Sequence, residues 1–309
     1  MNISVITNKQ CNFNCDFCYL SSIDKQDKTI LNLDTLKSRF ENILNKFNLT
    51  NFESINIYGG EVSLLSDIYI DKLISLCKIY SSDISIVSNG LIQKRFFEYP
   101  FITKSISFDY DIRENYKKVL KNITKYKDIN ILLLVSKRMY EKYSNESILE
   151  IINTLNEAHI KNISIIQYSQ IRDIQVPYWY YDKFVLNFLK YKDFCNFSIT
   201  NYDILMGYKK VSLLSNNHIF INNDGKYSEI KYDKNGNEYF IYYDSLDDVV
   251  SFFNEEKQLY NKNWICKDCE FKNCCIGEHY REVFYDPTIH SCSGNYMLMK
   301  EFQKWKSGK

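Results

Sequence analysis

The sequence contains little proline and has almost no net charge. Only three of its 309 residues are proline, while 16% are aromatic. This composition excludes intrinsic disorder, because disordered chains are poor in aromatic side chains. The 39 basic side chains are offset by 38 acidic ones, which gives a formal net charge of +1. With no strong field to gather phosphates at long range, we expect neither a nucleic acid nor an anionic lipid surface as a partner.

Targeting signals are missing as well. No uninterrupted apolar stretch reaches bilayer-spanning length. The N-terminal MNISVITNKQC lacks the basic, apolar and small-residue order of a secretory signal. We therefore expect a cytoplasmic protein that does not enter a membrane. A reducing cytosol opposes disulfides, so metal ligation explains the clustering of the ten cysteines better.

The chain does have enough apolar residues, 45%, to bury one large domain, or a large and a small one. Six segments rich in Ile, Val and Leu alternate with amphipathic stretches, which predicts a parallel sheet covered by helices. The predicted strands are 2–7, 53–58, 83–88, 104–108, 129–136 and 162–167. Helices are expected at 31–47, 66–80 and 111–126, with a short one after the third strand. Periodicity leaves open whether the sheet is flat or curved into a partial barrel.

The pattern changes after about residue 198. A hairpin is predicted at 218–230, with its turn at Asn223-Asp224-Gly225. An irregular polar stretch with further cysteines follows it. We expect a domain boundary between Cys195 and Tyr208, which gives domains 1–200 and 201–309.

Polar motifs follow the ends of the first four predicted strands. Ligands bind at the carboxyl ends of parallel strands, so these motifs are expected to share one rim. They are Cys11–Cys18, Gly59–Glu61, Ser88–Gly90 and Asp109.

The first motif is a loop of three cysteines spaced four and three residues apart. Thiolates at this spacing can converge on one cubic iron-sulfur cluster and leave one iron without a protein ligand. A structural zinc site is normally completed by a nearby Cys or His, and none lies between Tyr19 and Leu76. Zinc with a remote fourth ligand, and coincidence, are the alternatives.

This Cys-x3-Cys-x2-Cys loop, with Phe17 just before its last cysteine, resembles that of the radical S-adenosylmethionine (radical SAM) enzymes. The resemblance implies a partial (βα)6 barrel in which Cys11, Cys15 and Cys18 hold a [4Fe-4S] cluster. SAM would occupy the open iron. Reductive cleavage of SAM would then give methionine and a 5'-deoxyadenosyl radical, which abstracts hydrogen from a substrate.

The remaining rim motifs match the same family. The resemblance implies that Gly59, Gly60 and Glu61 lie near the methionyl amino group of SAM, although Val62 stands where the family commonly has proline. It places Ser88, Asn89 and Gly90 near the ribose and carboxylate. It also implies contacts of Ser107 and Asp109 with SAM or substrate, although Asp109 is equally suited to be a helix N-cap.

The later cysteines resemble part of the SPASM extension of peptide-modifying radical SAM enzymes. The resemblance implies that one auxiliary [4Fe-4S] cluster is held by Cys266, Cys269, Cys275 and Cys292. Ile230 and His279 stand at two cysteine positions of the family's inner auxiliary cluster, so we expect that cluster to be absent. A four-cysteine zinc site is the alternative. The spare Cys274 could replace Cys275, could return a hydrogen atom to a substrate radical as a catalytic thiol, or could be a buried bystander.

The resemblance favours an enzyme that cross-links, epimerises or oxidises a ribosomally synthesised peptide, and that receives electrons from an external flavodoxin- or ferredoxin-type donor. Because the chain begins directly at the first strand, leader recognition is expected from a separate leader-binding protein or from the barrel and its extension. The alternatives are a radical SAM enzyme with a small-molecule or protein substrate, and a non-catalytic iron-sulfur electron-transfer or scaffold protein.

Overall fold

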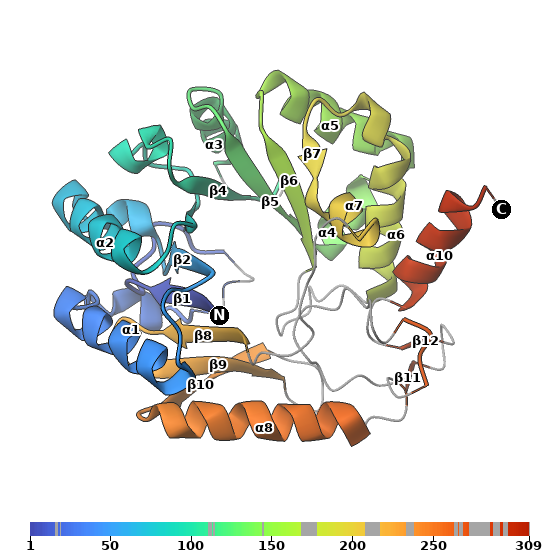
Figure 1. The fold of residues 1–309 in the computed structure, drawn as a ribbon. Coiled ribbons are helices and arrows are strands. Elements are labelled where there is room, and N and C mark those ends of the chain that lie inside the picture. The colour runs from blue at the N-terminus through green and yellow to red at the C-terminus, as the bar shows by residue number, and fades with distance from the viewer. Residues whose placement is uncertain are drawn as a thin grey trace.

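The chain folds around one large sheet with helices on its outer side (Figure 1). The computed structural model describes residues 1–15, 18, 20–110, 113, 115–143, 145–167, 178–207, 217–232, 238–262, 265, 268–271, 285–286, 291–292 and 296–308. The strands of the large sheet are β1 (Asn2–Ile6), β2 (Ser54–Tyr58), β3 (Ile84–Ser88), β4 (Thr103–Phe108), β5 (Ile129–Val135), β6 (Asn162–Gln167), β7 (Ser198–Ile199), β8 (His218–Ile221), β9 (Tyr227–Tyr232) and β10 (Glu238–Tyr243).

The helices alternate with these strands as the sequence predicts. They are α1 (Leu33–Phe47), α2 (Asp67–Tyr80), α3 (Tyr116–Ile123), α4 (Lys137–Lys142), α5 (Ile148–Glu157), α6 (Tyr178–Lys190), α7 (Thr200–Leu205), α8 (Leu246–Lys262) and α10 (Tyr296–Lys306). The 3-10 helices are η1 (Asp24–Gln26), η2 (Val62–Leu64), η3 (Arg95–Glu98), η4 (Asn145–Ser147) and η5 (Lys192–Phe194). The short element expected after the third strand is the 3-10 helix η3. No helix within the described residues is long and apolar enough to cross a membrane.

The six predicted strands are confirmed as β1 to β6, and each pairs in parallel with the next. Residues such as Ile3, Val5 and Ile57 point to the helix side of the sheet and are fully buried. Their neighbours Ser4 and Asn56 lie on the other face, because side chains alternate along a strand. Figure 1 shows that the strands form an open arc with α1 to α6 outside it. The sheet is therefore curved, which settles the question that periodicity left open.

Local sequence signals set the helix boundaries. Asn32 caps α1 by accepting hydrogen bonds from the backbone N–H groups of Asp34 and Thr35. Ser66 caps α2 in the same way, through the N–H of Tyr69. The loop after β1 therefore ends at the capped start of α1, and the loop after β2 ends at the capped start of α2.

The predicted hairpin is confirmed as the antiparallel pair β8 and β9, with Gly225 at a left-handed φ of 82° in its turn. The hairpin also continues the barrel sheet, because β8 pairs in parallel with β1. Its turn is fixed to the barrel where the Arg39 side chain donates to the Gly225 carbonyl at 2.7 Å. Asn223 reinforces this attachment by donating to Asp27 at 3.1 Å. Residues beyond 200 thus form part of the same sheet as the first strand, and the boundary at residue 200 stays a prediction.

Candidate functional site

The cysteine loop leaves the sheet directly at the carboxyl end of β1. The N–H of Thr7 donates to the Tyr58 carbonyl at 2.8 Å and extends the β1–β2 pairing by one residue. The Thr7 carbonyl then accepts from the N–H of Leu31 at 2.9 Å, which closes the loop just before α1. The segment that contains Cys11, Cys15 and Cys18 is therefore anchored at both ends on one buried threonine.

The three thiols of this loop are half-buried and none is in a disulfide. The N–H of Cys18 donates to the Cys15 carbonyl at 3.1 Å, which forms a tight turn between these two residues. Burial raises the pKa of Cys11 and raises that of Cys15 to about 11, and for Cys15 the charge of Arg113 opposes the effect. The Cys11 and Cys15 thiols must therefore lose their protons when they bind a metal. Phe17, the other residue predicted in this loop, lies outside the described residues.

Gly59 and Gly60 follow β2 and lie against the start of the cysteine loop. A Cβ at Gly59 would come within 2.5 Å of the Asn8 carbonyl oxygen, and one at Gly60 would collide with the carbonyls of Lys9 and Gln10. The N–H of Gly60 donates to the Asn8 carbonyl at 2.7 Å. The sequence suggested that these glycines admit a ligand. The structure gives them a packing reason, since they allow two backbone segments to touch.

Glu61 connects the loop after β2 to the loop after β3. Its buried carboxylate accepts hydrogen bonds from the N–H of Ser63 at 2.8 Å, the hydroxyl of Ser88 at 2.7 Å and the N–H of Asn89 at 2.7 Å. Both oxygens are therefore satisfied by the protein. The Glu61 side chain therefore braces the Ser88–Asn89 turn.

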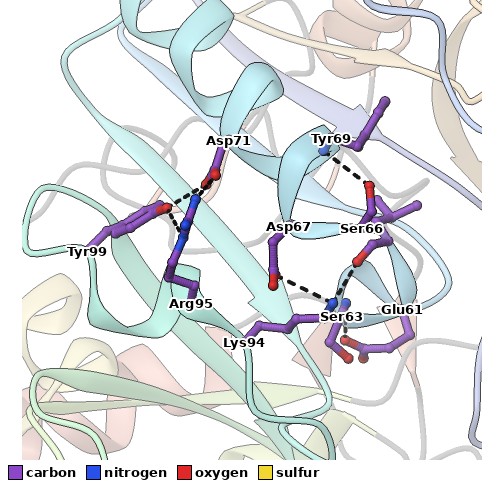
Figure 2. A network of polar contacts seen from close by, with 10 residues as sticks. Glu61, Ser63, Ser66, Asp67, Tyr69, Asp71, Lys94, Arg95 and Tyr99 are labelled. Carbon is purple, nitrogen blue, oxygen red and sulfur yellow. Dashed lines mark hydrogen bonds and ion pairs between the residues drawn. The ribbon is translucent and has the colours of Figure 1, made fainter.

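A second set of polar contacts continues this brace along the outside of the rim (Figure 2). Lys94, which precedes η3, donates to the Leu65 carbonyl at 2.8 Å and lies 3.5 Å from the Asp67 carboxylate. One turn further along α2, Asp71 accepts from both Arg95 and Tyr99. The segment after the Ser88–Asn89 turn is therefore bound by hydrogen bonds and ion pairs to the segment after Gly59 and Gly60.

On the β4 side of the rim, Asp109 forms a buried ion pair with Arg113. The Nε and Nη2 atoms of Arg113 lie 2.8 and 2.7 Å from Oδ2 of Asp109. The same guanidinium donates to the carbonyl of Ser107 at 2.9 Å and to its hydroxyl at 3.2 Å. Burial raises the pKa of Asp109, and the charge of Arg113 opposes the rise. The other oxygen, Oδ1, is buried and has no hydrogen-bond partner among the described residues.

Asp109 is not the cap of the helix that follows it. The N-cap position of α3 is held by Asn115, at a left-handed φ of 65° and without a side-chain cap bond. The alternative role considered for Asp109 is therefore wrong. Its unpartnered oxygen instead fits a carboxylate that receives a hydrogen bond from a bound molecule.

Three residues that sequence reasoning missed connect the rim to the cysteine loop. The Arg113 guanidinium lies 5.5 Å from the ring centre of Phe13, between Cys11 and Cys15. Lys25 donates to the Phe13 carbonyl at 3.2 Å. Asn12 accepts from the Asn89 side chain at 2.7 Å. Only Arg113 had a readable signal, since it stands four residues after Asp109.

The second cysteine group is only partly described. Cys269 is half-buried and is not in a disulfide. Cys292 lies in the short strand β12 (Ser291–Cys292), which pairs with β11 (Tyr285–Asp286). Cys266, Cys274 and Cys275 lie outside the described residues. Within the part that is described, no group of three His, Cys, Asp or Glu side chains is arranged to hold a single metal ion. This finding covers Cys11, Cys15 and Cys18, which are all described, so both predicted ligand sets stay predictions.

Comparison with known proteins gives the class of protein that this fold and rim define. The Radical SAM superfamily model matches residues 5–169, more than half of the chain, and the chain belongs to this superfamily. No curated protein matches it in sequence. The curved parallel sheet is thus a radical SAM partial barrel, and the family implies SAM and a [4Fe-4S] cluster.

Solved structures share the fold over most of the chain. One is native anSMEcpe with bound AdoMet, at 19% identity and a TM-score of 0.67, with 88% of each chain covered. Another is SuiB of Streptococcus suis bound to S-adenosylmethionine, at 17% identity and a TM-score of 0.61, with 90% of this chain and 72% of SuiB covered. At these identities the likeness extends to the fold alone.

The residues present fit the implied cofactors. The donor set on the cysteine loop is three soft thiols free of disulfides, the ligand type that iron-sulfur clusters use. Beside it, the buried Oδ1 of Asp109 lacks a donor, and a hydroxyl or amino group of a nucleotide cofactor would supply one.

Proposed function

We propose that this protein reductively cleaves SAM and uses the resulting radical to modify a ribosomally synthesised peptide, by cross-linking, epimerisation or side-chain oxidation. The observation that carries the proposal is the position of the three cysteines. Their loop is anchored at the carboxyl end of β1 and borders both the Glu61 brace and the Asp109–Arg113 pair.

The chemistry of cleavage would belong to the cofactors: a cluster held by Cys11, Cys15 and Cys18 would supply the electron for the reductive cleavage of SAM. The chain's own residues hold and orient. Cys11, Cys15 and Cys18 are the proposed cluster ligands. The Ser88–Asn89 turn, fixed by Glu61, and the free oxygen of Asp109 are proposed to bind SAM on either side of them.

The peptide substrate rests on the solved structures that share the fold. One of them is anSMEcpe with bound AdoMet and the Cp18Cys peptide, at 19% identity and a TM-score of 0.65. Another is SuiB bound to its precursor peptide SuiA, at 17% identity and a TM-score of 0.59. For this chain we propose the same class of substrate, together with a SPASM-like region over 201–309 that holds one auxiliary cluster through Cys266, Cys269, Cys275 and Cys292.

The test is anaerobic reconstitution with iron and sulfide, followed by addition of SAM and dithionite. The expected product is 5'-deoxyadenosine, and a peptide encoded beside the gene should raise its yield and lose hydrogen or gain a cross-link. Full cluster loading without 5'-deoxyadenosine would identify an iron-sulfur scaffold instead. Cleavage that no adjacent peptide stimulates would favour a small-molecule or protein substrate.

The two cysteine groups are separable in the same assay. Cys269→Ala should lower iron content and peptide turnover more than it lowers SAM cleavage, because the proposed auxiliary cluster has four thiolates and no iron free for SAM. If 5'-deoxyadenosine formation fell as much as the iron content, separate roles for the two cysteine groups would be contradicted.

A further inference from the structure

Helix α3 carries a cluster of exposed lysines that have no acidic partner among the residues that the structure describes. Five lysines on α3 and the turn after it are exposed: Lys117, Lys118, Lys121, Lys125 and Lys127. Within the described residues, none of them forms an ion pair. Some helical lysines elsewhere are in ion pairs, as in Lys37–Glu41 on α1 and Lys137–Glu141 on α4. In a chain with a net charge of only +1, this positive charge is concentrated locally.

The lysines of α3 share its outer side. Lys118 and Lys121 are three residues apart and Lys117 and Lys121 are four apart, so they are neighbours on the helix surface. The opposite face is buried through Val119, Asn122 and Ile123. The lysine face therefore cannot be part of the core and is presented outward, where Figure 1 shows α3 on the outer side of the barrel.

The first turn of α3 lies close to the cysteine loop along the chain and through contacts. Helix α3 begins at Tyr116, three residues after Arg113, whose guanidinium lies over Phe13 of that loop. The Tyr116 ring is 5.9 Å from the ring of Tyr110, which follows Asp109. A protein resting on Lys117, Lys118 and Lys121 would thus sit beside the rim that holds the proposed cluster.

We infer that this lysine face, defined as Lys117, Lys118 and Lys121, docks an acidic one-electron carrier protein with a flavin or iron-sulfur centre. The inference rests on the proposed function, since reductive cleavage needs one electron from outside for each SAM cleaved. One electron leaves the reduced carrier and enters the cluster, and no atom or proton is transferred between the proteins. Electron-transfer encounters use small interfaces, and complementary charge raises their association rate more than their affinity. A short, uncompensated lysine face suits such an encounter.

The test compares two charge reversals in the full-length, cluster-loaded protein. Lys118→Glu/Lys121→Glu changes the lysine face. Lys257→Glu/Lys262→Glu makes the same change of charge at exposed positions of α8, which lies at the β10 end of the sheet, away from α3 in Figure 1. Glutamate keeps helix propensity close to that of lysine. Cluster reduction by enzymatically reduced acidic flavodoxin is followed by loss of visible absorbance, and 5'-deoxyadenosine is measured in parallel with dithionite.

The α3 variant should accept electrons from flavodoxin about 10-fold more slowly at low ionic strength, within the range by which electrostatic steering raises association rates. Its rate with dithionite should stay within about 2-fold of wild type, because a small reductant needs no docking surface. Added salt should slow cluster reduction by flavodoxin in wild type and in the α8 variant, but should have little effect on the rate of the α3 variant.

Equal rates of cluster reduction by flavodoxin in wild type and the α3 variant would overturn the inference, as would equal losses in the α3 and α8 variants. Weakened binding of a polyglutamate peptide or of RNA without any change in cluster reduction would assign the face to another partner and also overturn it. Absence of SAM cleavage by wild type with dithionite would remove the proposed function, while cluster reduction by flavodoxin would still report on the docking.

Discussion

The two sides of the rim each contain a buried carboxylate, and the two are satisfied differently. On the β2–β3 side, Glu61 receives three hydrogen bonds from Ser63, Ser88 and Asn89. On the β4 side, one oxygen of Asp109 is bound by Arg113 and the other has no partner. A buried carboxylate oxygen without a donor is costly, at about 1–3 kcal/mol.

This difference assigns a positioning role to Glu61 and a binding role to Asp109. The Glu61 side has no spare hydrogen-bonding capacity in its carboxylate, so that residue fixes the shape of the loops around the cysteines. On the Asp109 side, the unpartnered carboxylate oxygen is an acceptor beside Cys15. A cofactor or substrate that donates a hydrogen bond to it would offset the free-energy cost of burying it. Substitutions on each side should therefore affect stability and SAM binding in different proportions.

The largest effect is expected where the two sides meet, at the cysteine loop. Cys15→Ala should reduce 5'-deoxyadenosine formation below detection, because a cluster with two protein thiolates is not held at this loop. The matched control is Cys195→Ala, which removes a half-buried thiol in the turn after η5. Iron content and 5'-deoxyadenosine are measured on both. Normal cleavage by the Cys15 variant would refute the assignment of the loop.

The next largest effect is expected from Glu61→Gln. The Gln side chain keeps one acceptor and replaces the other with an N–H2 group facing the donors of the Ser88–Asn89 turn, so the free energy of unfolding should fall by about 2–3 kcal/mol. SAM affinity, measured by equilibrium binding to the loaded protein, should fall at least about 10-fold as the turn moves.

Ser88→Ala is the matched control on the same side. It removes one donor to Glu61 and leaves the N–H bonds of Ser63 and Asn89, so a loss of about 1 kcal/mol is expected. If Glu61→Gln were as mild as Ser88→Ala in stability while abolishing SAM binding, Glu61 would be a ligand and not a brace.

The hydrophobic pattern alone predicted most of the barrel. Strands such as INILLLV at 129–135 are buried on alternate residues, and their short length and β-branched residues distinguish such apolar runs from helices. The hairpin was predictable because Asn-Asp-Gly supplies the left-handed residue that its turn needs, at Gly225. These features depend on neighbours in sequence.

The parts that could not be predicted depend on register between distant segments. Glu61 and Asn89 are joined only because β2 and β3 end side by side. The pairing of β8 with β1 unites residues more than 200 positions apart, and no local pattern encodes it. The glycines at 59 and 60 were noticed for their motif, but the touching of Asn8 and Gly59 is a tertiary contact.

A smaller effect is expected from Arg113→Lys on the β4 side. Lysine keeps the charge beside Asp109 but cannot donate to Asp109 and to the carbonyl of Ser107 with one planar group. The free energy of unfolding should fall by about 1–2 kcal/mol, and SAM cleavage should fall several-fold with little loss of iron. Arg138→Lys, at an exposed position of α4, is the control. Loss of iron equal to that in Cys15→Ala would place Arg113 in cluster retention and not in orienting Asp109.

The smallest effect is expected from a buried carboxyl far from the rim, which tests whether an unpartnered oxygen by itself marks a ligand site. Glu229 on β9 is buried with Oε1 unpartnered, and burial together with the nearby Glu256 of α8 raises its pKa well above the ordinary value. Because the folded protein holds this proton more tightly than the unfolded chain, the stabilisation is present at low pH and is lost as the pH rises through the folded-state pKa. Glu229→Gln should match wild type at pH 4 and exceed it by about 1 kcal/mol at pH 8 in urea denaturation, with SAM cleavage unchanged. The exposed Glu255→Gln is the matched control. If Glu229→Gln instead impaired SAM cleavage, an unpartnered carboxylate oxygen would not by itself mark a ligand site. The unpartnered oxygen of Asp109 would then no longer support a binding role for the β4 side of the rim.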